Sequence, residues 1–210
     1  ARARKPDEVA MTAWWAQVDA WRARNSLGYK QTGDTIKPQY AVERLYKLAR
    51  AIGSPDLICL ANLQVSPLYQ GRLVEARQIL NRASLPRDID QQRSLAYRYG
   101  MSPSVVGLAY LAHCVWLLGD PEQANQHSQE ALELAAKVAV PMTSCYALGR
   151  SSWQHAFTGQ LEATRIQAEK LLQITCQHGF RNFELGARFL LAWVNAQSGD
   201  SVLAQVESMY

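Results

Sequence analysis

Histidine and cysteine are the side chains in this sequence that could hold a metal ion or act as nucleophiles. The chain has four of each, and the two types come closest at His113–Cys114 and at Cys176–His178. Adjacent residues on a helix diverge by about 100°, so His113 and Cys114 cannot easily share a zinc ion. Cys176 and His178 also fall on different helix faces. Neither pair has an orienting third group, so we predict no metal site and no nucleophilic site.

Phosphate chemistry has no sequence signature either. The chain lacks a GxxxxGK[ST] motif, and its acidic residues form no metal-binding pair on a strand. Gly33–Asp34 and Gly119–Asp120 are typical of loops and helix caps. We therefore predict no cofactor and no enzyme activity within this chain.

Composition indicates a folded, helix-forming chain rather than a fibrous or disordered one. Of the 210 residues, 48% are hydrophobic and 19% are charged. The net charge of +4 owes three positive charges to Arg2, Arg4 and Lys5, which makes a nucleic-acid partner unlikely on charge grounds. No apolar run suits a membrane span or a signal peptide. The four scattered cysteines, Cys59, Cys114, Cys145 and Cys176, are expected to be small buried hydrophobes in a reducing compartment. We expect a cytoplasmic location, no membrane contact, and a longer parent protein.

The elements that position these residues follow from three glycines spaced 40 residues apart, Gly119, Gly159 and Gly199. They lie in the similar segments WLLGDPEQA, AFTGQLEA and AQSGDSVLA, and Gly71 in LYQGRLVEA is a looser fourth copy. Small residues recur twelve and seven positions before the three glycines: Gly107, Ala147 and Ala187, then Ala112, Ser152 and Ala192. A period of this length predicts stacked helix pairs that touch closely at the small residues.

The resulting prediction is a single all-α domain over 1–210. About five antiparallel helix pairs are expected, at 6–52, 55–84, 103–139, 141–178 and 180–210. Pro103, Pro121 and Pro141 each suit the first turn of a helix, whereas Pro67 should kink one. Residues 85–102 break the period and are too polar for a core helix, so we predict an irregular insertion there.

The segment GLAYLAHCVWLLGDPEQANQHSQEALELA resembles a tetratricopeptide-type repeat. Its matching residues are Leu108, Leu111, Ala112, Gly119, Ala124, Ala131 and Leu132. Extended to RSLAYRYGMSPSVVGLAYLAHCVWLLGDPEQA, it is similar to the helical C-terminal region of bacterial AAA-like signalling ATPases, including those linked to class III adenylate/guanylate cyclases. The resemblance implies a right-handed superhelical array attached to an ATPase, cyclase, kinase or transcription regulator.

The tetratricopeptide register places a stripe of aromatic residues on the concave face of the array. The position six residues before the glycine holds Val65, His113, Trp153 and Trp193. With neighbouring stripes, the candidate groove comprises Tyr110, His113, Trp116, Tyr146, Trp153, Phe157, Phe189 and Trp193. These rings either pack between successive repeats or anchor a peptide or another domain.

The predicted insertion supplies a second candidate contact, Tyr97, Arg98 and Tyr99. This part of the chain is rich in arginine, with few acidic residues to balance it, a pattern most often found on solvated helix faces. The two aromatic residues and the arginine between them either brace two repeats internally or contact a neighbouring domain of the same chain. We favour the internal brace, because long insertions in compact arrays are kept for packing or contact reasons.

Three functional hypotheses follow. The first is a regulatory interaction module that binds a protein or peptide partner and relays its state to the attached output domain. The second is a small-molecule sensor, in which Asn62, Gln64, Gln154 and Asn195 join the aromatic residues. The third is a scaffold that forms homo-oligomers through its end faces.

Overall fold

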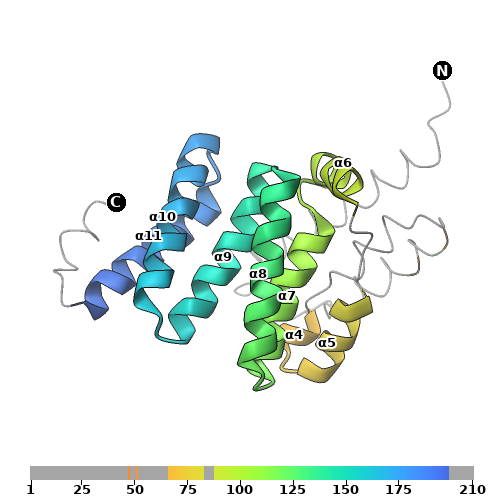
Figure 1. Cartoon of the computed structure of the whole chain (residues 1–210), viewed down its shortest axis with the longest axis horizontal. Coiled ribbons are helices and arrows are strands. Elements are labelled where there is room, and N and C mark those ends of the chain that lie inside the picture. The colour runs from red at the N-terminus through yellow and green to blue at the C-terminus, as the bar shows by residue number, and fades with distance from the viewer. Residues whose placement is uncertain (1–46, 48–50, 52–65, 83–87, 199–210) are drawn as a thin grey trace, which may run out of the picture.

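The computed structural model describes residues 47, 51, 66–82 and 88–198. Residues 66–82 and 88–198 form eight helices and no strand, so the all-α prediction is confirmed for them. The helices are α4 (Ser66–Tyr69), α5 (Leu73–Arg82), α6 (Ile89–Tyr99), α7 (Pro103–Leu117), α8 (Pro121–Val138), α9 (Pro141–Phe157), α10 (Leu161–His178) and α11 (Arg181–Gln197) (Figure 1). Apart from residues 47 and 51, the predicted first repeat lies outside the described residues, as do Val65 and the helix after Ser198.

The predicted helix starts after residue 102 agree with the structure. Pro103, Pro121 and Pro141 each occupy the first turn of a helix, where the missing backbone N–H would have no helical partner. The first two of these helices also carry side-chain caps: Ser102 Oγ accepts from the Val105 amide, and Asp120 from the Gln123 amide. Local sequence therefore fixes where these helices begin.

Two of the repeated glycines, Gly119 and Gly159, each end the first helix of a pair. Gly119 has φ 90° and Gly159 has φ 73°, values in the left-handed region that glycine adopts without steric cost. Just beyond each glycine, a backbone amide bonds back to the helix that has ended, from Asp120 to Val115 and from Gln160 to His155. The chain can thus reverse within two or three residues and start the antiparallel partner helix.

Residues 89–99 correct the prediction of an irregular insertion, because they form the helix α6. Asp88 accepts a hydrogen bond from the Asp90 amide at its start, and Gly100 ends it with φ 79°. Among the side chains of this helix that the structure describes, only Gln92, Leu95 and Ala96 are buried. A helix that buries so narrow a face keeps a polar sequence, which explains why its composition suggested a loop.

Polar contacts attach α6 to the following helices. Gln92 is fully buried, and its Oε1 accepts from Ser102 Oγ at 2.7 Å and from the Ser104 amide at 3.3 Å. The Ser102 amide in turn donates to Thr143 Oγ1 at 3.0 Å. This network, which we call the Gln92 junction, links α6 to the starts of α7 and α9.

Arg93 adds a second attachment of α6, at the C-terminal end of α8. Its Nε donates to the Val138 carbonyl at 3.1 Å, and its Nη2 donates to the Lys137 carbonyl at 3.0 Å. The last carbonyls of a helix lack helical partners and carry partial negative charge, so an arginine suits them. The helix α6 is therefore an integral part of the fold.

The helices from α7 onward pack against their neighbours along the chain. The first helices of successive pairs, α7, α9 and α11, contact one another, and α8 and α10 each pack against the helix before and after them. The small residues predicted at the contacts are buried, except Ala192, which is half-buried. Figure 1 shows the helices α7 to α11 following one another across the molecule.

The most apolar of these helices is α7, which contains no charged residue. It is largely buried because α5, α6, α8 and α9 all pack against it. Within the described residues, no helix taken singly has both the length and the apolar composition of a membrane span. The bent pair Ile89–Arg98 and Pro103–Leu117, with 93° between its arms, meets both criteria only when the arms are combined.

Candidate functional site: an aromatic face beside an arginine

Five rings from α7, α9 and α11 form a continuous set of contacts. The centroids of Trp116 and Phe157 are 5.7 Å apart with nearly parallel planes, and Phe157 also lies 5.7 Å from Trp153. Trp153 stacks at 5.6 Å on Phe189. His113 lies 5.8 Å from Trp116 and 5.9 Å from Phe157. We call His113, Trp116, Trp153, Phe157 and Phe189 the aromatic row.

The repeat spacing explains why these rings meet. His113 and Trp153 occupy the same position relative to Gly119 and Gly159, 40 residues apart. Since α7, α9 and α11 contact one another, equivalent positions on these helices come to the same face of the molecule. The structure therefore brings five of the eight predicted groove residues into one contiguous surface.

The row is only partly covered by protein. Phe157 is 54% exposed and Phe189 is 53% exposed, whereas His113, Trp116 and Trp153 are half-buried. Trp193 is also half-buried and packs against the cluster of Ala156, Ala168 and Leu190. The rings thus pack between helices and also present apolar surface to solvent. Whether they anchor a partner stays a prediction.

Tyr110, another predicted groove residue, belongs to a second group of side chains that is centred on Arg150. Arg150 Nη2 donates to the hydroxyls of Tyr69 and Tyr110, at 2.8 Å each. The guanidinium carbon also lies 4.2 Å from the centroid of the Tyr110 ring, a cation–π distance. Burial raises the pKa of Tyr110 against the opposing effect of the Arg150 charge, so the hydroxyl is neutral at pH 7.

A hollow of about 260 Å³ opens beside Arg150, between α9 and α11. Its lining residues are Tyr146, Gly149, Arg150, Trp153, Leu171, Asn182, Phe183 and Gly186. Tyr146 and Phe183 meet edge to face at 5.0 Å on one side of it. Gly186 is one of the lining residues, and a Cβ atom there would meet no atom within 4 Å, so a side chain can be added at this position without a clash.

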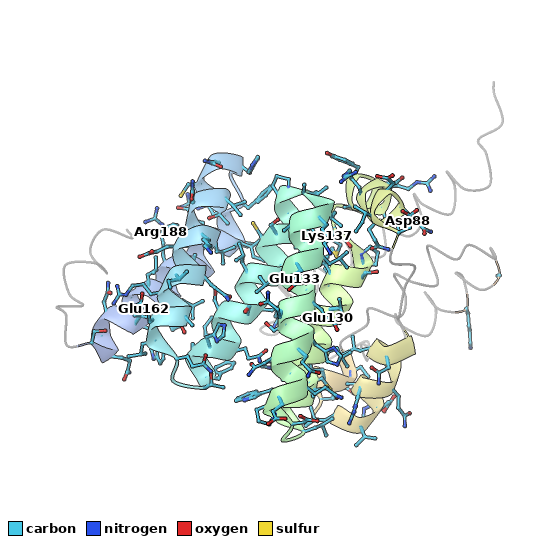
Figure 2. The ribbon with its side chains drawn as sticks, viewed as in Figure 1. Asp88, Glu130, Glu133, Lys137, Glu162 and Arg188 are labelled. Atoms are coloured by element: carbon cyan, nitrogen blue, oxygen red, sulfur yellow. The ribbon has the colours of Figure 1, made fainter. Side chains whose placement is uncertain are left out.

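Charge is distributed unevenly between the two sets of helices. On α7 and α9, Arg150 is the single Lys, Arg, Asp or Glu residue. Charged side chains instead gather on α8 and α10, where Figure 2 labels Glu130, Glu133 and Glu162. Burial and the Arg150 charge both lower the pKa of His113, and burial lowers that of His155. We call the aromatic row together with Arg150 the aromatic face, and Arg150 is the one permanent charge among these residues.

Four residues of this region were not predicted as site residues from the sequence: Tyr69, Arg150, Asn182 and Phe183. The repeat period contained a signal for one of them, because Arg150 lies 40 residues after Tyr110 and occupies the equivalent position. Nothing comparable marked Phe183, which meets Tyr146 only because α11 packs on α9.

The predicted contact in residues 85–102 lies on α6. Tyr97 is 73% exposed and Arg98 is also exposed, while the side chain of Tyr99 is not among those the structure describes. Gln92 and Arg93 make described hydrogen bonds from α6 to other helices, and Ala96 packs against Val138 and Val140. The arginines at 72 and 77 also have partners, Glu75 at 2.8 Å and Gln123 at 3.0 Å.

Other polar residues considered from the sequence have structural partners or lie outside the description. Gln154 donates to Asn125 at 3.1 Å, and Asn195 accepts from Arg165 at 2.7 Å. Neither residue is among those that line the hollow. Asn62 and Gln64 lie outside the described residues. The described part of the chain holds no group of three His, Cys, Asp or Glu residues placed to bind a metal ion.

The cysteines differ in environment. Cys114 and Cys145 are buried, as predicted, and burial raises the pKa of the Cys145 thiol to about 11. Cys176 is exposed, which corrects the expectation that it is a buried hydrophobe, because it lies on the outer side of α10 away from the packed face. Cys59 lies outside the described residues.

Comparison with known proteins gives only short matches. No family model matches this chain. It is 43% identical over 37 residues to the acetolactate synthase isozyme 3 large subunit of Escherichia coli, a match to 18% of this chain and 6% of that protein. It is 33% identical over 43 residues to the acetolactate synthase large subunit of Haemophilus influenzae, covering 20% of this chain and 8% of the relative. Because the chain spans less than a tenth of these relatives, the matches show neither a family nor an activity.

Proposed function

We propose that this chain is a protein-interaction module that binds a peptide segment of a partner on its aromatic face. In this proposal the helices form a right-handed superhelical array of tetratricopeptide type, and the aromatic row lines its concave side. The supporting observation is the contiguous set of rings on α7, α9 and α11, two of which are more than half exposed. Partly exposed aromatic side chains on a rigid helical surface are the groups that most often anchor a bound partner.

The chemistry of the face supports a binding role without catalysis. Its described residues include no paired acid and base, no group placed to bind a metal, and no activated thiol. A nearly uncharged surface instead favours apolar side chains of a partner, which lose water as they contact the rings. We therefore propose that the module has no enzyme activity of its own.

The resemblance to signalling ATPases and cyclases suggests what binding would accomplish. We propose that the module belongs to a cytoplasmic bacterial regulator and that its partner shifts the attached output domain between two states. Such coupling requires the partner to bind the two states with different affinities. The neighbouring domains of the same parent protein are further candidates for the bound segment.

Selection of peptides tests the proposed face. A displayed library of random peptides of about twelve residues is selected against the 210-residue chain, and the affinities of the winners are measured by calorimetry. The double variant Phe157→Ala/Phe189→Ala removes the two most exposed rings and is expected to weaken binding by about tenfold or more. Ile166→Ala is the matched control, because Ile166 is 43% exposed but lies on α10.

Two results would contradict this proposal. One is a selection that yields no binder, and the other is a set of binders with equal affinity for the double variant and the parent. Circular dichroism of each variant shows whether the helices are intact, so a loss of binding through unfolding is recognised.

Self-association is the competing use of the same apolar surface. Sedimentation of the chain over a wide concentration range distinguishes the two, because a closed dimer requires the same patch on both copies. A monomer at high concentration supports the peptide-binding proposal. If the chain forms a dimer and the double substitution dissociates it into monomers, the face is instead assigned to the formation of homo-oligomers.

A further inference from the structure

Arg150 carries a charge that no described carboxylate balances. Its described hydrogen bonds go to the hydroxyls of Tyr69 and Tyr110, and no described residue accepts from its Nε or Nη1 atoms. Glu184 is the acidic residue on α11, and it pairs with Arg188 at 3.0 Å. An unpaired charge is costly where water is partly excluded. A half-buried arginine of this kind therefore favours binding of an anion that accepts its remaining hydrogen bonds and balances its charge.

The hollow lies where such an anion would be held. Arg150 is one of its lining residues, and the exposed Asn182 adds an amide at the rim. The other lining residues are apolar, aromatic or glycine, so the body of the ligand meets carbon rather than charge. The volume of about 260 Å³ falls just below the range of pockets for drug-sized ligands, which limits the ligand to about one ring.

We propose that the hollow between α9 and α11 binds a monocarboxylate carried on an apolar group of about one ring. The carboxylate pairs with Arg150, and the ring lies against Tyr146, Trp153 and Phe183. Arg150 Nη2 already donates to the two tyrosine hydroxyls, so the carboxylate accepts a charge-assisted hydrogen bond from Nη1 or Nε. A phosphate dianion suits the site less, because the described lining offers it only one cation.

The chemistry is the same for two sources of the carboxylate, a free small acid and the C-terminus of a peptide that ends in an aromatic residue. The inference does not depend on the proposed peptide-binding function. It concerns Arg150 and Gly186, whereas the test of that function changes Phe157 and Phe189, which do not line the hollow. Either proposal can therefore fail alone.

The test compares ligands that differ only in charge. The 210-residue chain is titrated with 3-phenylpropionate and with its neutral amide, and binding is followed by calorimetry and ligand-observed NMR. A ligand of this size is expected to bind with a Kd of about 1 mM, and the amide about tenfold or more weakly. A second arm uses a short peptide ending in phenylalanine, with a free or an amidated C-terminus.

Variants separate the charge from the cavity. Arg150→Gln is expected to weaken carboxylate binding by about tenfold or more, and Arg150→Lys by less, since lysine keeps the positive charge but not the fixed geometry of the guanidinium. Gly186→Leu leaves Arg150 in place and fills the hollow, so it should abolish binding. Leu185→Ala changes an exposed neighbour on α11 that does not line the hollow, and it should bind as the parent does.

The results decide whether the hollow binds a carboxylate and whether that carboxylate comes from a small acid or from a peptide C-terminus. Tighter binding of the free acid assigns the site to small acids, and tighter binding of the peptide carboxylate assigns it to polypeptide ends. Equal binding of acid and amide, no binding of either carboxylate, or unchanged binding to Gly186→Leu would each overturn the proposal. If Arg150→Gln unfolds, the Gly186→Leu result and the acid–amide comparison still decide it.

Discussion

The Gln92 junction and the aromatic face use polar and aromatic residues in opposite ways. At the junction, the buried Oε1 atom of Gln92 and the Ser102 amide have hydrogen-bond partners within the fold. On the aromatic face, two rings are more than half exposed, and Arg150 lacks a carboxylate partner among the described residues. Groups that are satisfied internally hold the structure together, whereas exposed rings and an unpaired charge are available to a ligand.

The two regions also differ in what a substitution should do. A change at the junction leaves buried donors without acceptors, so its cost appears in stability. A change on the aromatic face removes surface that is already half in water, so its cost appears mainly in binding. Stability and binding measured on the same variants therefore test the distinction.

The largest expected effect on stability comes from Gln92→Ala. The substitution removes the acceptor of Ser102 Oγ and leaves a space in a fully buried position, so we expect a loss of about 2–4 kcal/mol in the free energy of unfolding. Urea denaturation followed by circular dichroism measures it. Ser94→Ala, at an exposed position of α6, should change stability by less than about 0.5 kcal/mol, and Phe189→Ala by about 1 kcal/mol. A larger loss from Phe189→Ala than from Gln92→Ala would contradict the comparison.

An intermediate effect is expected from Arg93→Ala. This change removes two charge-assisted hydrogen bonds to the last carbonyls of α8, at Lys137 and Val138, and should cost about 1–2 kcal/mol. Because the contact is local, amide hydrogen exchange should speed up in α6 and at the end of α8 before it does in α10. Arg93→Lys keeps the charge and should lose less. Uniform acceleration through all helices would show that α6 is not held by this contact.

The smallest expected effect is a pH dependence that arises at the aromatic row. Burial and the Arg150 charge lower the pKa of His113 in the folded protein below its ordinary value of 6.5. As the pH falls through that value, the unfolded chain takes up a proton before the folded chain does, so stability declines and then levels off below the folded pKa. Unfolding measured between about pH 7.5 and 5.5 should show this decline.

His113→Gln identifies the source of the decline. The variant should lose stability less steeply over the same pH range, and the part that is left is assigned to His155, whose pKa is lowered in the same direction. A stability that is constant with pH, or an unchanged slope in His113→Gln, would show that burial and the Arg150 charge do not lower the pKa of His113.

Much of the helical framework was predictable from short-range signals. Pro103, Pro121 and Pro141 marked helix starts, and Gly119 and Gly159 marked helix ends, because each acts on the backbone of its own segment. The helix α6 was missed because its composition is polar. Its inward side consists of only a few residues, and one of them is a glutamine that is satisfied by residues ten or more positions away.

The aromatic face was predictable in part from the repeat period. A 40-residue period places equivalent residues on one side of successive helices, and that was enough to group His113 with Trp153. It did not predict Phe183 opposite Tyr146 or the bonds from Arg150 to two tyrosines. Tyr69 lies 81 residues before Arg150, a separation that no local pattern addresses.

The sequence alone determined where the chain turns and which helix sides are apolar, since backbone preferences and helical periodicity act over a few residues. Only the tertiary structure decided which rings touch, which residues line the hollow, and which cation has no carboxylate partner among the described residues. These properties depend on the distances and crossing angles between packed helices, which are set by the whole core rather than by any one segment.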